Sequence, residues 1–185
     1  MQKNKFLFIC TLIFMLLFSA CDKTPIIPNE EEVITTLHYN LSPIGGGTPV
    51  VLTFQDLDGD GGNAPTITSG TLEINKTYTG VLVLLNETMN PIDSISTEVA
   101  EENVDHQFFF ESTVNGLTVQ YNDTDDDGNP LGLSSTLTTT SAGTGILTIT
   151  LRHEPNKLAS GVSNGDIDNA GGETDIEVSF NIDVQ

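Results

Sequence analysis

The sequence predicts an all-β protein, an antiparallel β-sandwich of immunoglobulin-like type. Apolar and polar residues alternate with a period of two in most segments after position 33, as they do in strands with one buried face. Clusters of Gly, Pro, Asn and Asp separate these segments at 43–49, 58–65, 123–132 and 164–172. About seven or eight short strands divided by turns favour a sandwich. The Cys-Trp-Cys hallmark is absent from the sequence, so the expectation concerns architecture and not membership of the immunoglobulin family.

The first twenty residues predict a secretory signal peptide. Two lysines precede an apolar run at 6–18, which is shorter than the roughly twenty residues of a membrane-spanning helix. Small residues follow the run, as they do before a cleavage site. An uncleaved N-terminal anchor stays open as an alternative.

The residues after this run, Leu17-Phe18-Ser19-Ala20-Cys21, resemble the lipobox of bacterial lipoproteins, with Phe18 in place of the usual aliphatic residue. The resemblance implies that residues 1–20 are removed and that Cys21 carries acyl chains, which hold a protein stably on a bilayer. Ordinary signal cleavage after Ala20 is the rival interpretation. The lipid places the protein on a membrane of the cell envelope, which we expect to be the outer membrane. The periplasmic face and the cell surface both stay open.

The charge of the chain excludes one class of partner. The 185 residues hold 26 acidic and 6 basic side chains, a formal net charge of −20, and loss of two signal-peptide lysines makes it −22. Binding to nucleic acid or to bare anionic lipid requires clustered Lys and Arg, which this chain lacks. Cys10 leaves with the signal peptide and Cys21 is lipidated, so no disulfide is expected.

The predicted organisation is a signal peptide at 1–20, a lipidated cysteine with a flexible tether at 21–32, and a sandwich domain at 33–185. The tether contains two prolines and a triple glutamate, which favour an extended, solvated chain. Within the domain, the expected strands are 33–41, 50–55, 71–75, 78–85, 107–112, 117–121, 147–152 and 175–184.

Two segments of the domain depart from simple alternation. Segment 78–85 is almost entirely apolar, which predicts a central strand covered on both faces. Segment 95–105 carries Ile95 and Val99 four residues apart among three glutamates, which favours a short exposed helix, with a polar loop as the alternative.

Two aspartate-rich loops carry the main chemical signal. Both read Asp-x-Asp-x-Asp-Gly directly after a predicted strand, and alternating carboxylates around a glycine turn can bind calcium. Solvated hairpin turns in an acidic protein are the alternative. The acidic stretch 166–173 is expected to be a plain loop. The six candidate calcium ligands are Asp56, Asp58, Asp60, Asp123, Asp125 and Asp127.

No catalytic pattern stands out. His38, His106 and His153 show no zinc-binding spacing, and neither a Gly-x-Ser-x-Gly elbow nor a phosphate loop occurs. In Phe108-Phe109-Phe110 the middle ring faces away from its neighbours. Either segment 95–105 covers Phe109, or Phe109 is an exposed anchor for a partner.

The chain resembles a group of small acidic lipoproteins of Bacteroidota-type bacteria. The shared stretches are Glu31-Glu32-Val33-Ile34-Thr35-Thr36, the Asp56 loop, His106-Gln107-Phe108-Phe109-Phe110 and Arg152-His153-Glu154-Pro155. Such proteins are sometimes labelled "type 1 periplasmic binding fold", which requires two α/β lobes. This chain is too short and lacks the alternating strands and helices. The resemblance implies no activity.

The sequence therefore predicts a non-enzymatic, lipid-anchored sandwich that binds a protein or glycan partner, with calcium as the one expected cofactor. Two alternatives are a periplasmic carrier of a small ligand, which needs an enclosed pocket, and an envelope hydrolase, which needs converging titratable groups.

Overall fold

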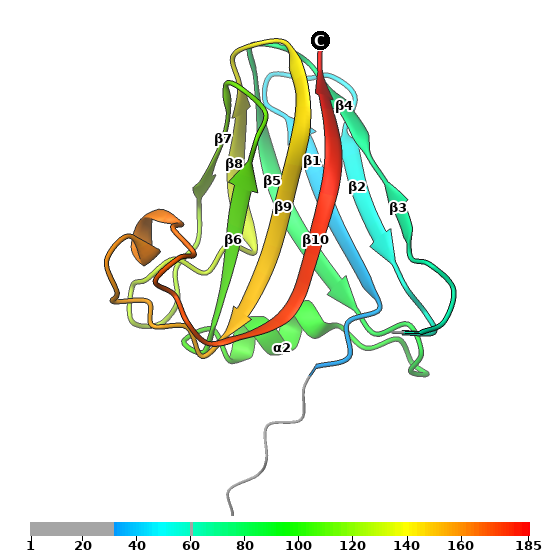
Figure 1. Cartoon of the computed structure of the whole chain (residues 1–185), viewed down its shortest axis with the longest axis vertical. Helices are drawn as coiled ribbons and strands as arrows, with labels where there is room; N and C mark the ends of the chain where they lie inside the picture. Colours follow the sequence, from blue (N-terminus) through cyan, green and yellow to red (C-terminus); the bar gives the residue numbers. More distant parts are fainter. Residues whose placement is uncertain (1–31, 60) are drawn as a thin grey trace, which may run out of the picture. The chain divides into compact units, whose positions relative to one another are not determined.

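The computed structural model describes residues 32–59 and 61–185, which form a β-sandwich (Figure 1). One sheet has the strand order β3-β2-β1-β5-β8-β7, and the other has the order β4-β10-β9-β6. The predicted all-β sandwich is confirmed. Its strands are β1 (Thr36–Pro43), β2 (Val50–Gln55), β3 (Thr66–Thr68), β4 (Gly70–Leu72), β5 (Lys76–Leu85), β6 (His106–Ser112), β7 (Leu117–Tyr121), β8 (Ser134–Thr139), β9 (Gly143–His153) and β10 (Glu173–Val184).

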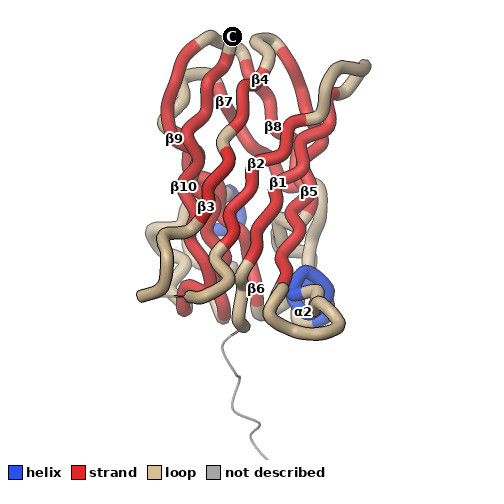
Figure 2. The backbone as a smooth tube through the Cα atoms, turned by 90° about the vertical axis from the view of Figure 1, so that its right-hand side faces the viewer, coloured by secondary structure: helices blue, strands red, loops and turns tan. Residues whose placement is uncertain are grey.

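The two sheets face each other as layers, and their inward side chains form the core (Figure 2). Every strand pair is antiparallel among the described residues except β4 with β10, which run parallel. The alternation read from the sequence sets which side chains point inward. Fully buried core residues include Leu37, Leu41, Leu52, Leu84, Phe108, Leu147, Ile149, Leu151 and Phe180.

Strand β8 was not predicted because two of its three inward side chains are small and polar. Ser135, Leu137 and Thr139 face the core, and the Ser135 hydroxyl lies 2.7 Å from the buried hydroxyl of Tyr39. Because a hydrogen-bond partner satisfies each buried polar group, the strand needs no apolar alternation. The three-residue strand β3, at the sheet edge, was also not expected.

The expected position of β5 is confirmed, but its expected coverage is wrong. β5 pairs with β1 on one side and β8 on the other, so it is a central strand. Its outward face nevertheless meets solvent, and Val81 is 43% exposed. The long apolar run therefore reflects β-branched and leucine residues on a half-open face rather than a second packed layer.

A short helix covers one end of the sandwich. The predicted helix is confirmed as α2 (Ile95–Glu101), at the lower end in both views (Figures 1 and 2). Ile95 and Val99 are buried against the core, as their spacing of four residues requires. In residues 32–59 and 61–185, the other short helical element is the 3₁₀ turn η1 (Val162–Asn164). Within the described ranges, no helix is long and apolar enough to cross a membrane.

Candidate functional site

Several predicted features lie outside the described residues. They are the lipobox with Cys21, the tether as far as residue 31, and Asp60 of the first aspartate loop. The lipid anchor and the flexible tether therefore stay predictions. Glu32, which the sequence assigned to the end of the tether, is described and belongs to the same compact unit as the sandwich. Its side chain is only 10% exposed, so the expected solvated position is wrong for this residue.

In the first aspartate loop, the two described carboxylates are used to hold the turn. Asp56 Oδ1 accepts the backbone N–H groups of Asp58 (3.2 Å) and Gly59 (2.9 Å). Asp58 Oδ2 accepts the backbone N–H of Asn63 (3.1 Å) and its side-chain amide (2.7 Å). These bonds from Asn63 hold the pKa of the exposed Asp58 carboxyl below its ordinary value. The loop is thus an Asx-type turn even without a cation.

In the second loop, each of the first two carboxylates binds a different piece of backbone. Asp123 accepts the N–H groups of Gly132 (2.7 Å) and Ser134 (2.8 Å), on the return to β8. Asp125 Oδ1 accepts those of Asp127 (3.0 Å) and Asn129 (2.7 Å) within the loop. The ligand oxygens of Asp123, Asp125 and Asp127 do not gather within 4.8 Å of one another, so the structure does not bring these three predicted ligands to one point.

The chain itself supplies a cation to the second loop. Lys157 Nζ donates to Asp125 Oδ2 at 2.8 Å and to the backbone carbonyl of Asn103 at 2.7 Å. Burial raises the pKa of Asp125, but the hydrogen bonds from Lys157 and Asn129 and the Lys157 charge outweigh burial, so its pKa is lowered. The ammonium lies where a metal ion on this oxygen would bind. Calcium at this loop stays a prediction that this contact disfavours.

Phe109 is fully buried, so the predicted exposed anchor for a partner is wrong. It points to the outer face of the four-stranded sheet, as expected, but a small second core covers it. The residues of this core are Ala159, Val162, Ile167 and Ala170. The cover is therefore the loop between β9 and β10, not segment 95–105, which caps the end of the sandwich.

A cluster of titratable side chains that the sequence did not indicate lies near the C-terminal end of α2. Strands β6 and β9 pair so that His106 and His153 stand directly opposite each other. Their rings stack with centroids 4.8 Å apart. His106 is fully buried and His153 retains 14% exposure. Both side chains continue the core face of their strands, two residues beyond Phe108 and Leu151.

A β-bulge brings a carboxylate to the two histidines. The pairing of β10 with β9 shifts register between Thr174 and Ile176, which leaves Asp175 as the extra residue. In a regular strand Asp175 would point away from the core face that Ile176 occupies, and a bulge re-aims such a side chain. Asp175 is 7% exposed, with its oxygens 3.7 Å from His106 Nε2 and 4.0 Å from His153 Nδ1.

Glu32, four residues before strand β1 of the opposite sheet, closes the cluster. Its Oε1 lies 3.3 Å from His106 Nε2. On the other side of the ring, His106 Nδ1 lies 3.1 Å from the backbone carbonyl of Glu102, just after α2. Three buried atoms in this cluster have no hydrogen-bond partner: Glu32 Oε2, His106 Nε2 and Asp175 Oδ2.

The surroundings within the cluster shift the pKa values of Asp175 and His106. Burial, with the nearby charge of Glu32, raises the pKa of Asp175 to about 6, against the opposing pull of both histidines. Burial lowers the pKa of His106, but the Glu32 carboxylate close to Nε2, the Glu102 carbonyl at Nδ1 and the charge of Asp175 outweigh burial, so its pKa is raised. Asp175 and His106 thus both hold a proton more tightly here than in water.

The sequence could have indicated the two histidines of this cluster but not its two carboxylates. Period-two alternation alone could have placed His106 and His153 on the core faces of their strands, where an isolated histidine is uncommon. The strand register that makes them opposite neighbours, the bulge at Asp175 and the return of Glu32 are long-range features without a local pattern.

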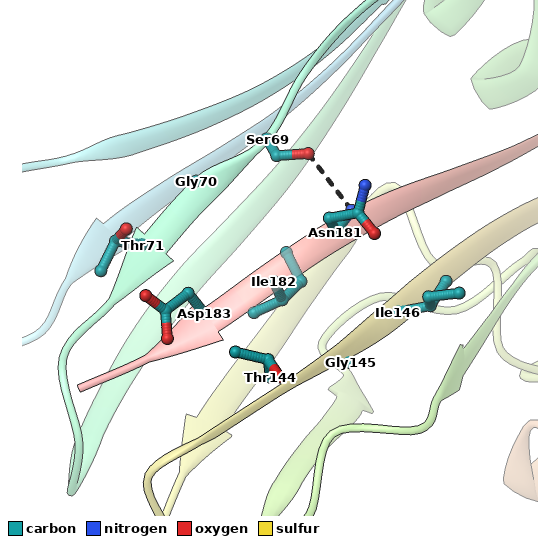
Figure 3. A pocket seen from close by; sticks show the side chains of 9 residues that line it. All are labelled: Ser69, Gly70, Thr71, Thr144, Gly145, Ile146, Asn181, Ile182 and Asp183. Atoms are coloured by element: carbon teal, nitrogen blue, oxygen red, sulfur yellow. Dashed lines mark hydrogen bonds between the residues drawn. The ribbon is translucent and has the colours of Figure 1, made fainter.

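A hollow of about 480 Å³ lies on the four-stranded sheet, near the end that carries the C-terminus (Figure 3). It spans β4, β10 and β9, where the backbone N–H of Asn181 donates to the Ser69 hydroxyl at 3.2 Å. The lining residues are Ser69, Gly70, Thr71, Thr144, Gly145, Ile146, Asn181, Ile182 and Asp183.

Comparison with protein-family models, curated proteins and solved structures finds no match to this chain. The chemistry of the sites described above therefore carries the functional proposal.

Proposed function

We propose that the protein is a lipid-anchored β-sandwich of the cell envelope that acts as a non-enzymatic binding module. The observation that carries the proposal is the hollow on the outer face of the four-stranded sheet, whose lining is both polar and apolar (Figure 3). Lipid attachment at Cys21 and an outer-membrane location are the expectations of the sequence and form part of the proposal.

The outer face of this sheet is divided into a covered half and an open half. The loop between β9 and β10 packs on β6 through Phe109 and Val162, and both are fully buried. Toward β4 no such cover lies on the described part of the sheet, and Thr144 and Asn181 are exposed. An uncovered stretch of sheet beside a covered one supports a binding surface there.

The open half offers both hydrogen bonds and apolar contact. Hydroxyl, amide and carboxylate groups line the hollow, with Ile146, which is 42% exposed, as its large exposed apolar side chain. Such groups suit a polar protein surface or the hydroxyls of a glycan. The acidic balance of the chain disfavours nucleic acid as the partner.

Binding is favoured over hydrolysis because the hollow and the titratable cluster lie at opposite ends of β9. Thr144 lines the hollow and His153 belongs to the cluster, which puts them roughly 30 Å apart at about 3.3 Å per strand residue. Asp183 is the one ionisable side chain among the residues described as lining the hollow. A hydrolase would need several such groups around the bound substrate.

The test uses residues 22–185, which contain the whole sandwich, to capture partners from cell envelopes. Thr144→Arg places a long side chain in the hollow, whereas the matched control Thr118→Arg alters an exposed position on β7 in the other sheet. We expect capture by the parent and by Thr118→Arg, and at least a tenfold loss in Thr144→Arg. Equal capture by both variants, or none by the parent, would refute the proposed surface.

A further inference from the structure

We propose that His106, His153, Asp175 and Glu32 form a structural zinc site at the end of the sandwich that α2 covers. The site is distinct from the hollow of the proposed function and from both aspartate loops, so it stands or falls independently of them.

The ligand atoms are already spaced for one ion. The structure brings atoms of His106, His153 and Asp175 within 4.8 Å of one another. Around tetrahedral zinc, nitrogen and oxygen ligands at about 2.0–2.2 Å lie roughly 3.3–3.6 Å from each other. The separations are 3.3 Å from Glu32 Oε1 to His106 Nε2, 3.7 Å from His106 Nε2 to Asp175 Oδ2 and 4.0 Å from His153 Nδ1 to Asp175 Oδ1, which approach these values. The two stacked rings would tilt to aim their nitrogens at a shared ion.

The hydrogen bonds of His106 select the ring nitrogen that faces the ion. The Glu102 carbonyl can only accept, so the contact at 3.1 Å places the proton of a neutral ring on Nδ1. Nε2 then presents a lone pair to the carboxylates of Glu32 and Asp175, and it has no hydrogen-bond partner although it is fully buried. Metal-bound histidines characteristically donate their other N–H to a carbonyl or carboxylate in this way.

The unpartnered oxygens point to the same conclusion. Asp175 Oδ2 and Glu32 Oε2 are buried acceptors without donors among the described residues. Two carboxylates close together and shielded from water repel each other unless a cation lies between them. A divalent ion bound to both and to His106 Nε2 would satisfy all of these atoms at once.

The donor set favours zinc over calcium. Two imidazole nitrogens with carboxylate oxygens suit Zn²⁺, whereas Ca²⁺ prefers six to eight oxygens. His106, His153 and Asp175 gather as one group, and Glu32 adds a fourth donor 3.3 Å from His106 Nε2. The low exposure of all four side chains suits the closed form of structural zinc sites. The ion would join Glu32, at the start of the domain, to β6, β9 and the bulge of β10.

The experiment titrates metal-depleted residues 22–185 with ZnCl₂ in a buffer that contains excess calcium, so that any calcium loop is already saturated. Calorimetry gives the stoichiometry and affinity, and substitution with Co²⁺ gives a visible spectrum that reports nitrogen ligands and tetrahedral geometry. The ligand variants are Asp175→Asn and His153→Gln. The matched control is His38→Gln, since His38 bonds Thr53 at 3.0 Å and lies outside the cluster.

We expect about one zinc per chain, a tetrahedral cobalt spectrum, and an affinity at least about tenfold weaker in both ligand variants but unchanged in His38→Gln. The cobalt spectrum of the parent decides the case even where a variant folds poorly. The proposal is overturned by the absence of stoichiometric zinc, by an octahedral oxygen-only cobalt spectrum, or by equal affinity in well-folded Asp175→Asn and His153→Gln. Any of these results would mean that the cluster is not a zinc site.

Discussion

The ammonium of Lys157 lies 2.8 Å from Asp125 Oδ2, and both side chains are at least 95% buried. This pair joins the second aspartate loop to the loop between β9 and β10, and through the Asn103 carbonyl to the segment after α2. Three segments that carry little regular structure are thus held together by one desolvated ion pair.

Removal of Lys157 should destabilise the protein strongly. Lys157→Met leaves Asp125 as a buried charge without its partner, which costs about 3–5 kcal/mol in the free energy of unfolding. The matched control is Lys76→Met, because Lys76 pairs at 3.5 Å with Glu73, whose side chain is 59% exposed. That exposed pair contributes about 1 kcal/mol or less. Urea denaturation measures both values, and similar losses would contradict the structural role of Lys157.

The same pair predicts a component of the acid denaturation. The folded pKa of Asp125 lies below the ordinary value of about 3.9, so its contribution to stability is present above that value and is lost as pH falls through the folded pKa. Asp125→Asn should therefore show a shallower loss of stability below about pH 4. Asp126→Asn, an exposed neighbour, should retain the slope of the parent. Denaturant midpoints from pH 5 to 2 compare the three proteins.

Calcium should raise the melting temperature, and a chelator should lower it, through the first aspartate loop. Lys157 already neutralises Asp125 in the second loop, whereas the exposed Asp58 has no cationic partner among the described residues. Asp58→Asn should abolish the shift, and Asp127→Asn in the second loop should leave it intact. If neither calcium nor a chelator changes the melting temperature, the loops are not calcium sites.

Phe109 should matter for stability rather than for partner binding. Phe109→Ala empties the small core under the loop between β9 and β10, which costs about 3–5 kcal/mol. Leu158→Ala in the same loop changes a side chain that is 86% exposed, so its effect should stay within about 0.5 kcal/mol. Thermal denaturation separates the two, and a negligible effect of Phe109→Ala would contradict the packing.

Cys21 should carry the lipid. Cells grown with labelled palmitate should incorporate the label into the parent and into Cys10→Ser, because Cys10 leaves with the signal peptide. Cys21→Ser should contain none. If the parent takes up no label and Cys21→Ser is cleaved to the same size as the parent, the signal peptide is removed by ordinary cleavage instead. Protease treatment of intact cells then distinguishes the surface from the periplasm.

Local periodicity was enough to predict most strands and the short helix. Side chains at alternate positions of β1, β9 and β10 share one face whatever the strands pair with, so the sandwich follows from the pattern. Strand β8 escaped because Ser135 and Thr139 are buried through hydrogen bonds, which composition does not reveal. The coverage of β5 was misjudged because apolar β-branched residues also favour strands on an open face.

The candidate sites likewise include some that the sequence indicated and some that depend on the tertiary structure. The sequence by itself determined the aspartate loops, their turns and the acidic surface, because these depend on neighbours along the chain. Only the tertiary structure decided that Lys157 lies on Asp125 and that a loop covers Phe109. The tertiary structure also places Glu32 and Asp175 beside the paired His106 and His153, which the sequence did not indicate. These contacts join residues that lie dozens of positions apart in the sequence. They depend on strand register, on one bulge and on side-chain burial. None of these three features leaves a local pattern in the sequence.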